Sequence, residues 1–317
     1  MARDSLWWRR SAGSARRSHD SHQGRRQRHG WRRRRRLGGK LHRRRHSRIA
    51  RIIGGIMAVA CVLAVGLGLA RFMQWEYEIS AVQGEQDAVA RRYGFNPGNI
   101  ISDGQFFNGN AMSRAEIQSF LNVHGASCSG GRCLKSKTFD TVDRPADNLC
   151  DAYTGANGES AAAIIDKAAR ACDISQKVLL TMVQKEQHLV TAAAPTDFQY
   201  KAAMGLSCPD SADCDPAYAG FFNQVYGAAR RYQYYRAHAK NYRYHAGTLN
   251  YVAYHPDKAC GGSTVYIENE ATALLYVYTP YQPNSAALRA NTGDSCSSYG
   301  NRNFSLIYRN WFGDPGR

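Results

Sequence analysis

The chain has 317 residues and a formal net charge of +17, and this charge is confined to one end. Residues 1–51 hold 19 of the 42 Lys and Arg with only two acids, so the remaining 23 bases equal the remaining 23 acids. This neutral remainder excludes a generally basic protein that would bind nucleic acid over its whole surface. It is long enough for one domain of roughly 220 residues behind the N-terminal segments.

Residues 1–51 form an arginine-rich tail without apolar periodicity, rich in Ser, Gly, His and Gln. Such a segment cannot bury enough apolar surface to fold, so we expect it to be disordered. Its strongest patch for nucleic acid is Arg32 to Arg36 beside Trp31, but setting membrane topology is the simpler role. Attraction to anionic lipid, at roughly 1 kcal/mol per basic residue near the surface, would hold the tail on the inner leaflet.

The segment 52–70 contains no charged side chain. At ~1.5 Å per residue it would span roughly 28 Å as a helix, about the thickness of a hydrocarbon core. Because basic segments stay in the cytoplasm, we expect a transmembrane helix with a cytoplasmic N-terminus and an extracellular C-terminal domain, in the plasma membrane. The alternative is a cleaved signal peptide that ends at Gly68-Leu69-Ala70.

Cysteine usage also indicates export. Cys61 lies inside the apolar segment, and eight further cysteines follow it. An even number outside the cell predicts four disulfides, although eight cysteines allow 105 pairings. Zinc is a weaker alternative, because no CxxC pair occurs and no nearby His completes a ligand set. Proximity along the chain favours Cys128 with Cys133 and Cys208 with Cys214, which leaves Cys150 with Cys172 and Cys260 with Cys296.

Beyond the apolar segment, the pattern predicts a mainly α domain with a small β element. Residues 71–92 are polar with scattered apolar positions and suit a stalk or a short amphipathic helix, so the folded domain would cover 93–317. The capping box Ser113-Arg114-Ala115-Glu116 predicts the start of one helix. Further helices are expected over 159–171, 176–190, from Asp215-Pro216 through Ala229, 269–278 and 303–312, with short strands at 249–254 and 264–267.

Glu186 is the most informative single residue. It lies at i+7 from Leu179 and i+3 from Val183, which places an acid on the apolar face of the 176–190 helix. A carboxylate there would lose hydration, so we expect it to favour its protonated form or to find a partner. A protonated carboxyl is what a general acid needs to protonate the leaving oxygen of a glycosidic bond. The ordinary alternative is a glutamate that reaches solvent or pairs with a cation such as Lys201.

These residues resemble the lysozyme-like superfamily of lytic transglycosylases and goose-type lysozymes. In that family an apolar helix ends in the catalytic glutamate and a small-residue segment follows after a loop. Val178 to Glu186 and Ala203-Met204-Gly205-Leu206 are similar to these motifs. The chain departs from the family where Gln187-His188 replaces the usual serine and Ser207-Cys208 replaces Met-Gln. The exported region also resembles actinobacterial surface proteins sometimes labelled haemagglutinin-related.

The resemblance implies a lysozyme-like domain that cleaves peptidoglycan or another cell-wall glycan without a cofactor or metal. Glu186 would be the single catalytic residue, because in a transglycosylase the substrate's own hydroxyl replaces water; hydrolysis, as in a muramidase, stays open. Residues 275–284 correspond to the family's tyrosine and asparagine motif. The implied substrate-binding residues are Met204, Gly205, Tyr278, Tyr281 and Asn284.

Three alternatives remain open. A two-carboxylate glycosidase would need a second acid about 5 to 10 Å from Glu186. A non-catalytic wall-binding or adhesion module could line a saccharide groove with aromatic side chains. A cysteine peptidase built on Cys260 and His255 would leave an odd thiol outside the cell. The candidate second acids are Asp197, Asp210, Asp213, Asp215, Asp257, Glu268 and Glu270, and the candidate groove aromatics are Phe198, Tyr200, Phe221, Phe222, Tyr254 and Tyr281.

Overall fold

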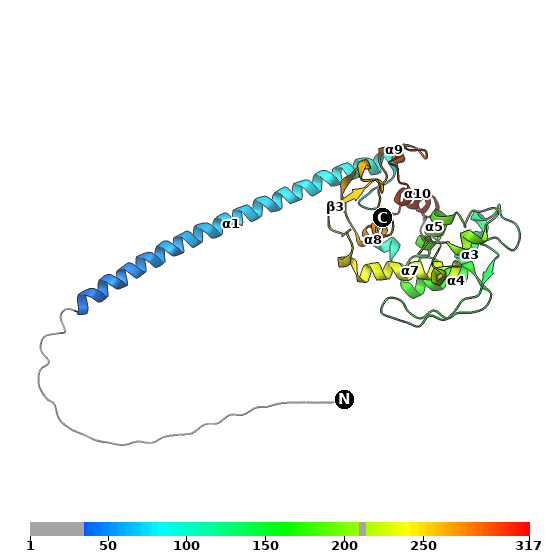
Figure 1. Ribbon diagram of the computed structural model, residues 1–317, viewed down its shortest axis with the longest axis horizontal. Coiled ribbons are helices and arrows are strands. Elements are labelled where there is room, and N and C mark those ends of the chain that lie inside the picture. The colour runs from blue at the N-terminus through cyan, green and yellow to red at the C-terminus, as the bar shows by residue number, and fades with distance from the viewer. Residues whose placement is uncertain (1–34, 209–213) are drawn as a thin grey trace, which may run out of the picture. The chain divides into compact units, whose positions relative to one another are not determined.

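A computed structural model describes residues 35–208 and 214–317, with side chains from residue 46 onward. The chain divides into two units, Met1–Arg71 and Phe72–Arg317, and the second contains the hydrophobic core (Figure 1). The first described element is α1 (Arg35–Tyr93), a continuous helix. The disorder expected for residues 1–51 is therefore wrong from Arg35 onward, since adding residues to an existing helix costs far less than nucleating one. Residues 1–34 lie outside the described part.

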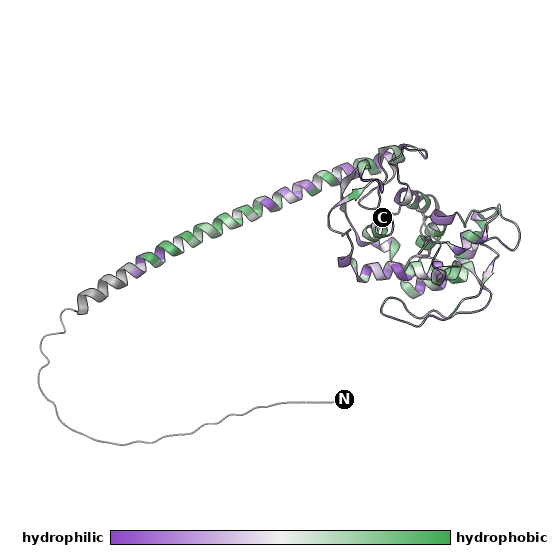
Figure 2. Cartoon of the chain, in the orientation of Figure 1, coloured by the Kyte–Doolittle hydropathy of each residue, from purple (hydrophilic) through white to green (hydrophobic). Residues whose placement is uncertain are grey.

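Helix α1 contains a segment, His46–Tyr93, that is long and apolar enough to cross a membrane. Its most apolar window has a mean hydropathy of 2.5 and is not buried within the protein. Figure 2 shows apolar positions gathered in the middle of α1, with polar positions nearer to Tyr93. Among the described residues this is the one helix that passes such a test, and it includes the predicted span 52–70.

The last turns of α1 pack against the folded domain. Ile79 and Gln86 are buried. The Gln86 side chain donates to the carbonyl of Tyr266 at 3.2 Å and accepts from its N–H at 2.7 Å. Residues 71–92 therefore form a helix, one of the two alternatives that the sequence suggested, and this helix is anchored on the domain near its end.

Helices form most of the folded domain, as predicted. Helix α4, the alanine-rich helix, contacts α3, α5 and α7, and α5 also contacts α10. Small alanine side chains let these helices approach closely, and the core is continuous around them. The helices after α1 are α2 (Asp103–Phe106), α3 (Arg114–His124), α4 (Ala161–Cys172), α5 (Gln176–Gln187), α6 (Asp197–Lys201), α7 (Phe221–Ala237), α8 (Glu270–Tyr278), α9 (Ser285–Arg289) and α10 (Gly300–Phe312).

The strands form two small antiparallel pairs. Strand β1 (Thr138–Phe139) pairs with β2 (Glu159–Ser160), and β3 (Thr248–Ala253) pairs with β4 (Gly262–Ile267). The second pair is the hairpin expected from the two β-branched runs, so a mainly α domain with a small β element is confirmed. Short 3₁₀ turns lie at η1 (Pro216–Tyr218), η2 (Ala239–Asn241) and η3 (Lys258–Cys260).

Local sequence signals predicted some helix ends correctly and others incorrectly. The capping box at Ser113 is present, with Glu116 bonded back to the Ser113 N–H. The helix expected from Asp215 onward is instead two elements, because Gly220 has a φ of +97° between η1 and α7. Helix α5 ends at Gln187, three residues early, because His188 adopts a left-handed φ of 55°.

All four favoured disulfides are confirmed. They join Cys128 to Cys133, Cys150 to Cys172, Cys208 to Cys214, and Cys260 to Cys296. Because these eight sulfur atoms are oxidised, they cannot ligate zinc, and Cys260 cannot serve as a peptidase nucleophile. Cys61 is the free cysteine of the described residues.

Candidate active site

Glu186 lies in the last turn of α5, at the edge of the core. Leu179 and Val183, on the same face, are fully buried, whereas the Glu186 side chain keeps 22% exposure. The expected loss of hydration is therefore partial. Because α5 ends at Gln187, the carboxylate reaches the surface while its stem packs inside.

Lys185 is the charged partner of Glu186. Its Nζ donates to Oε1 at 2.6 Å, and the Lys185 side chain is only 9% exposed. The same ammonium lies 3.4 Å from the Thr279 hydroxyl and 5.6 Å from the centre of the Tyr278 ring. The partner suggested by the sequence, Lys201, is wrong: it is exposed, and the ion pair is made by Lys185.

Gly205 borders the other oxygen of Glu186. A Cβ atom at this position would lie 3.2 Å from Oε2. Gly205 has a φ of +66°, a left-handed conformation that glycine adopts without steric cost. The structure thus brings the small-residue segment 203–206 directly against the carboxylate.

Gln224, on α7, holds the segment 203–206 in place through hydrogen bonds. Its Oε1 accepts from the N–H groups of Met204 and Leu206, each at 3.0 Å. Its Nε2 donates to the carbonyls of Leu206 and Tyr218, each at 2.8 Å. The side chain is fully buried and uses both of its polar atoms. The sequence analysis missed Gln224, although a polar residue among the apolar positions of that helix is a usable signal.

Tyr278 binds Met204 beside the Lys185–Glu186 pair. Its hydroxyl donates to the Met204 carbonyl, and its ring stacks on Tyr232 with the centres 5.3 Å apart. Burial, and then the charge of Glu186, raise the pKa of Tyr278 well above its usual value. The phenol therefore stays a neutral hydrogen-bond donor. Tyr232, also missed, is fully buried and contacts the Met182 sulfur through its hydroxyl at 3.8 Å.

Two of the predicted substrate-binding residues, Asn284 and Tyr281, make contacts with other parts of the domain. Asn284 caps α9, accepting from the N–H of Ala287 at 2.8 Å, and its amide donates to Asp294 at 2.8 Å. Tyr281 forms a backbone bridge to Ala253. Met204, Gly205 and Tyr278 are therefore grouped with Glu186, whereas the polar atoms of Asn284 are committed to α9 and to the loop that follows it.

The candidate second acids have other partners. Asp215 caps η1 and Asp257 caps η3, both through backbone N–H groups. Asp210 and Asp213 lie outside the described residues. Each of the remaining three is held by a side chain other than Glu186: Asp197 by Arg132, Glu268 by Asn96 and Glu270 by Arg236.

Three of the six aromatic residues expected to line a groove belong to the core, and Tyr254 and Tyr281 are partly exposed. Tyr200, Phe221 and Phe222 are buried, so they cannot line an open groove; Phe198 is 59% exposed. Two surface cavities, of about 540 and 300 Å³, lie elsewhere and are not lined by Glu186. The first lies beside the loop that leaves α5, and the second between residues 147–151 and the C-terminal ends of α4 and α7.

The residues grouped around Glu186 all lie in a region that matches a known family. Residues 99–317 match the model of a family described as LasA, N-terminal domain. The chain belongs to this LasA N-terminal domain family. The matched region runs from before α2 to the end of the chain and includes Glu186, Gly205 and Tyr278. Searches of curated proteins and of solved structures gave no match. Membership in the LasA N-terminal domain family is thus shown, and the lysozyme-like resemblance rests on the sequence motifs alone.

Proposed function

We propose that the C-terminal domain acts outside the cell on peptidoglycan glycan strands, with Glu186 as acid and then base. The LasA N-terminal domain family supports an extracellular protein with a role related to the cell wall. Four disulfides support an oxidising compartment. The lysozyme-like motifs narrow that role to cleavage of the glycan.

One observation carries the proposal: Oε2 of Glu186 lies against the backbone at Gly205. Two motifs that are 19 residues apart in the sequence meet at one carboxylate, as the resemblance implies. The absence of a side chain at Gly205 leaves room beside Oε2, and Tyr278 fixes the adjacent Met204 carbonyl. The partly exposed carboxyl can therefore reach a substrate while its surroundings stay rigid.

A single carboxyl is enough for transglycosylation. The Glu186 carboxyl gives its proton to the glycosidic oxygen, and the C–O bond to the leaving sugar breaks. The resulting carboxylate, held by the Lys185 ammonium, then takes the proton from the substrate's own hydroxyl as that oxygen bonds to the anomeric carbon. The five described candidate acids are engaged elsewhere, which favours this route over a two-carboxylate hydrolysis.

A non-catalytic wall-binding module is the second candidate. Its support is that Glu186 is already paired with Lys185 and that the 540 Å³ cavity lies elsewhere. An ion pair that only holds the end of α5 would look the same. The two candidates differ in whether glycan bonds break.

The membrane arrangement belongs to the same proposal. The apolar part of α1 would cross the plasma membrane once, and the arginine-rich residues before it would stay in the cytoplasm against anionic lipid. This leaves the domain at the outer face of the membrane, where wall glycan is the nearest polymer.

Product analysis tests the proposal directly. Full-length protein in detergent, with its disulfides intact, is incubated with purified peptidoglycan, and soluble products are identified by mass spectrometry. We expect anhydro-ended fragments from the native chain and none from Glu186→Gln. Glu270→Gln, which removes a carboxylate paired with Arg236, is the matched control and should remain active. No products from the native chain would leave the binding module as the better account, and products unchanged in Glu186→Gln would show that Glu186 is not the catalytic acid.

A further inference from the structure

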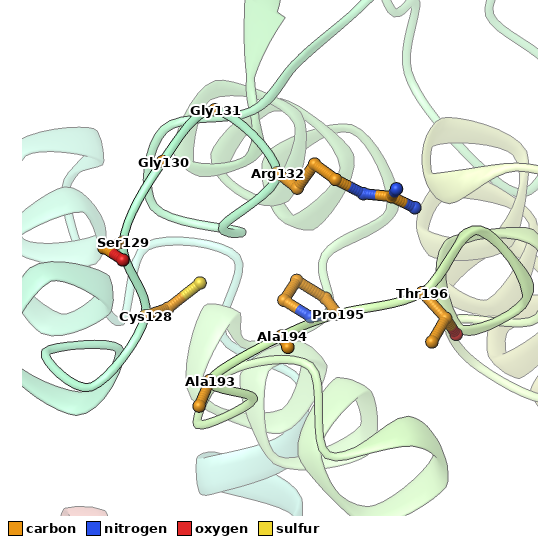
Figure 3. Close-up of a pocket in the computed structure, with 9 residues that line it drawn as sticks. All are labelled: Cys128, Ser129, Gly130, Gly131, Arg132, Ala193, Ala194, Pro195 and Thr196. Atoms are coloured by element: carbon orange, nitrogen blue, oxygen red, sulfur yellow. The ribbon is translucent and has the colours of Figure 1, made fainter.

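A solvent-open groove lies beside the loop that follows α5. Its volume is about 540 Å³, within the range of roughly 300–1,000 Å³ that is usual for small-molecule sites. One wall is the loop from Cys128 to Arg132, and the other is the segment from Ala193 to Thr196. Figure 3 shows the Arg132 side chain extending toward the Thr196 end of the opening.

Both walls are rigid before any ligand binds. The Cys128–Cys133 disulfide closes the first loop, and the buried Tyr200 hydroxyl donates to the Arg132 carbonyl at 2.5 Å. On the other wall, Thr196 forms a capping box with Gln199. A ligand would thus lose little binding free energy to ordering the site.

The lining combines small apolar side chains with one cation. Ala193, Ala194 and Pro195 supply the apolar part, and no atom lies within 4 Å of where a Cβ would stand on Gly130 or Gly131. The guanidinium of Arg132 is bonded to Asp197 at 2.8 Å, and both side chains are largely exposed, at 62% and 86%. An exposed pair of this kind contributes little stability, so another carboxylate can replace Asp197.

We infer that this groove binds the C-terminal end of short peptides with small side chains. The peptide's terminal carboxylate takes the place of Asp197 on the guanidinium of Arg132, in the geometry that Arg and carboxylate favour. Methyl side chains of the ligand pack on the alanine and proline wall.

The groove is connected to the candidate active site through the end of α5. Gln184, two residues before Glu186, donates to the Thr191 hydroxyl at 2.8 Å and accepts from the Thr191 N–H at 3.2 Å. Thr191 lies two residues before Ala193, so the groove wall and Glu186 are roughly 20 Å apart or less. Assigning the ligand to the peptide stem of peptidoglycan rests on the proposed function. The chemistry by which the groove binds a peptide does not.

Calorimetric titration of full-length protein in detergent tests the inference. The probes are acetyl-alanyl-alanine with a free carboxylate and the same peptide as its C-terminal amide, each in the D and L forms. We expect saturable binding of the free acid and about tenfold weaker binding of the amide, because a charge-assisted hydrogen bond is lost. A preference for the D form points to the peptide stems of the cell wall as the source of the ligand. Equal binding of the D and L forms, or a preference for the L form, points to ordinary peptides. Each of these outcomes agrees with the inferred binding chemistry.

Two substitutions should change the affinity for the peptide in opposite directions. Arg132→Gln should weaken binding of the free acid about tenfold, whereas Asp197→Asn should tighten it, because the competing carboxylate is removed. Arg309→Gln, which breaks an exposed pair with Asp314, is the matched control and should bind normally. Glu186→Gln should also bind normally, so failure of the catalytic proposal is distinguishable. No saturable binding, or equal binding of acid and amide, or an unchanged affinity in Arg132→Gln, overturns the inference.

Discussion

The Lys185 ammonium lies 2.6 Å from Oε1 of Glu186, the next residue in the chain. Neighbours in a helix normally point about 100° apart, so the two long side chains must bend toward each other to make this contact. The pair is mostly enclosed, at 9% and 22% exposure. Each charge therefore relies on the other more than surface charges do.

Breaking this pair should destabilise the domain. Lys185→Met leaves the carboxylate without its cation and should lower the free energy of unfolding by about 2 kcal/mol. The double variant Lys185→Met/Glu186→Gln should lose less, because no unpaired charge remains. Urea denaturation of the four chains of this double-mutant cycle measures the coupling. Additive effects of the two single changes would contradict the pairing.

Gly205→Ala should affect Glu186 specifically. The new methyl group would stand 3.2 Å from Oε2 in a left-handed backbone conformation with a φ of +66°. The backbone strain alone costs about 1 kcal/mol. Gly158→Ala is the matched control, since φ there is +68° and nothing lies within 4 Å of the new Cβ. We expect similar losses of stability but a loss of glycan cleavage only in Gly205→Ala; equal activity in both would show that the contact is unimportant.

Gln224→Met should disturb the 204–206 segment strongly. Two N–H groups and two carbonyls lose their partner in this buried turn, so the cost should be about 3 kcal/mol or more. Gln233→Met on the same helix is the comparison, because Gln233 donates one bond, to the Cys172 carbonyl. That change should cost about 1 kcal/mol. Thermal and urea unfolding measure both, and equal costs would argue against a positioning role for Gln224.

Glu159 should make stability sensitive to acid. Burial alone would raise the pKa of Glu159, but hydrogen bonds from Lys167, Thr141 and Tyr153 outweigh it and lower the pKa below its usual 4.5. Its ionised form therefore stabilises the folded state above about pH 4.5, and that contribution is lost as the pH falls further through the folded pKa.

The measurement is the urea midpoint from pH 6 to pH 3, in the native chain and in Glu159→Gln. Other acids, including Asp147, also have lowered pKa values and will contribute to the slope of both chains. The difference between the two curves isolates Glu159. We expect Glu159→Gln to be less stable at pH 6 and to converge on the native chain toward pH 3; parallel curves would refute the linkage.

The features that the sequence predicted best depend on near neighbours. The capping box at Ser113, the β3–β4 hairpin and the disulfides Cys128–Cys133 and Cys208–Cys214 each follow from residues close in the chain. The features it missed depend on contacts between distant segments. The docking of Gln86 on Tyr266 spans 180 positions, and the support of Met204 by Gln224 spans 20.

The candidate site was predicted in part for the same reason. Periodicity placed Glu186 on the inner face of its helix, and family motifs supplied Gly205 and Tyr278. No local pattern reports that Lys185 would turn back onto its neighbour or that Asn284 would be used as a helix cap. The aromatic residues Phe221 and Phe222 were ambiguous, because a ring that lines a groove and a ring that fills a core have the same sequence signature.

The disulfide pattern has a consequence for how the domain matures. The eight cysteines pair consecutively along the chain, the first with the second, the third with the fourth and so on, over separations of 5, 22, 6 and 36 residues. In the proposed topology the domain would emerge from the membrane with its N-terminal end first, and every thiol would then meet its correct partner before a later cysteine becomes available. Oxidation in order of emergence therefore gives the native connectivity, and the chain does not depend on reshuffling wrong bonds.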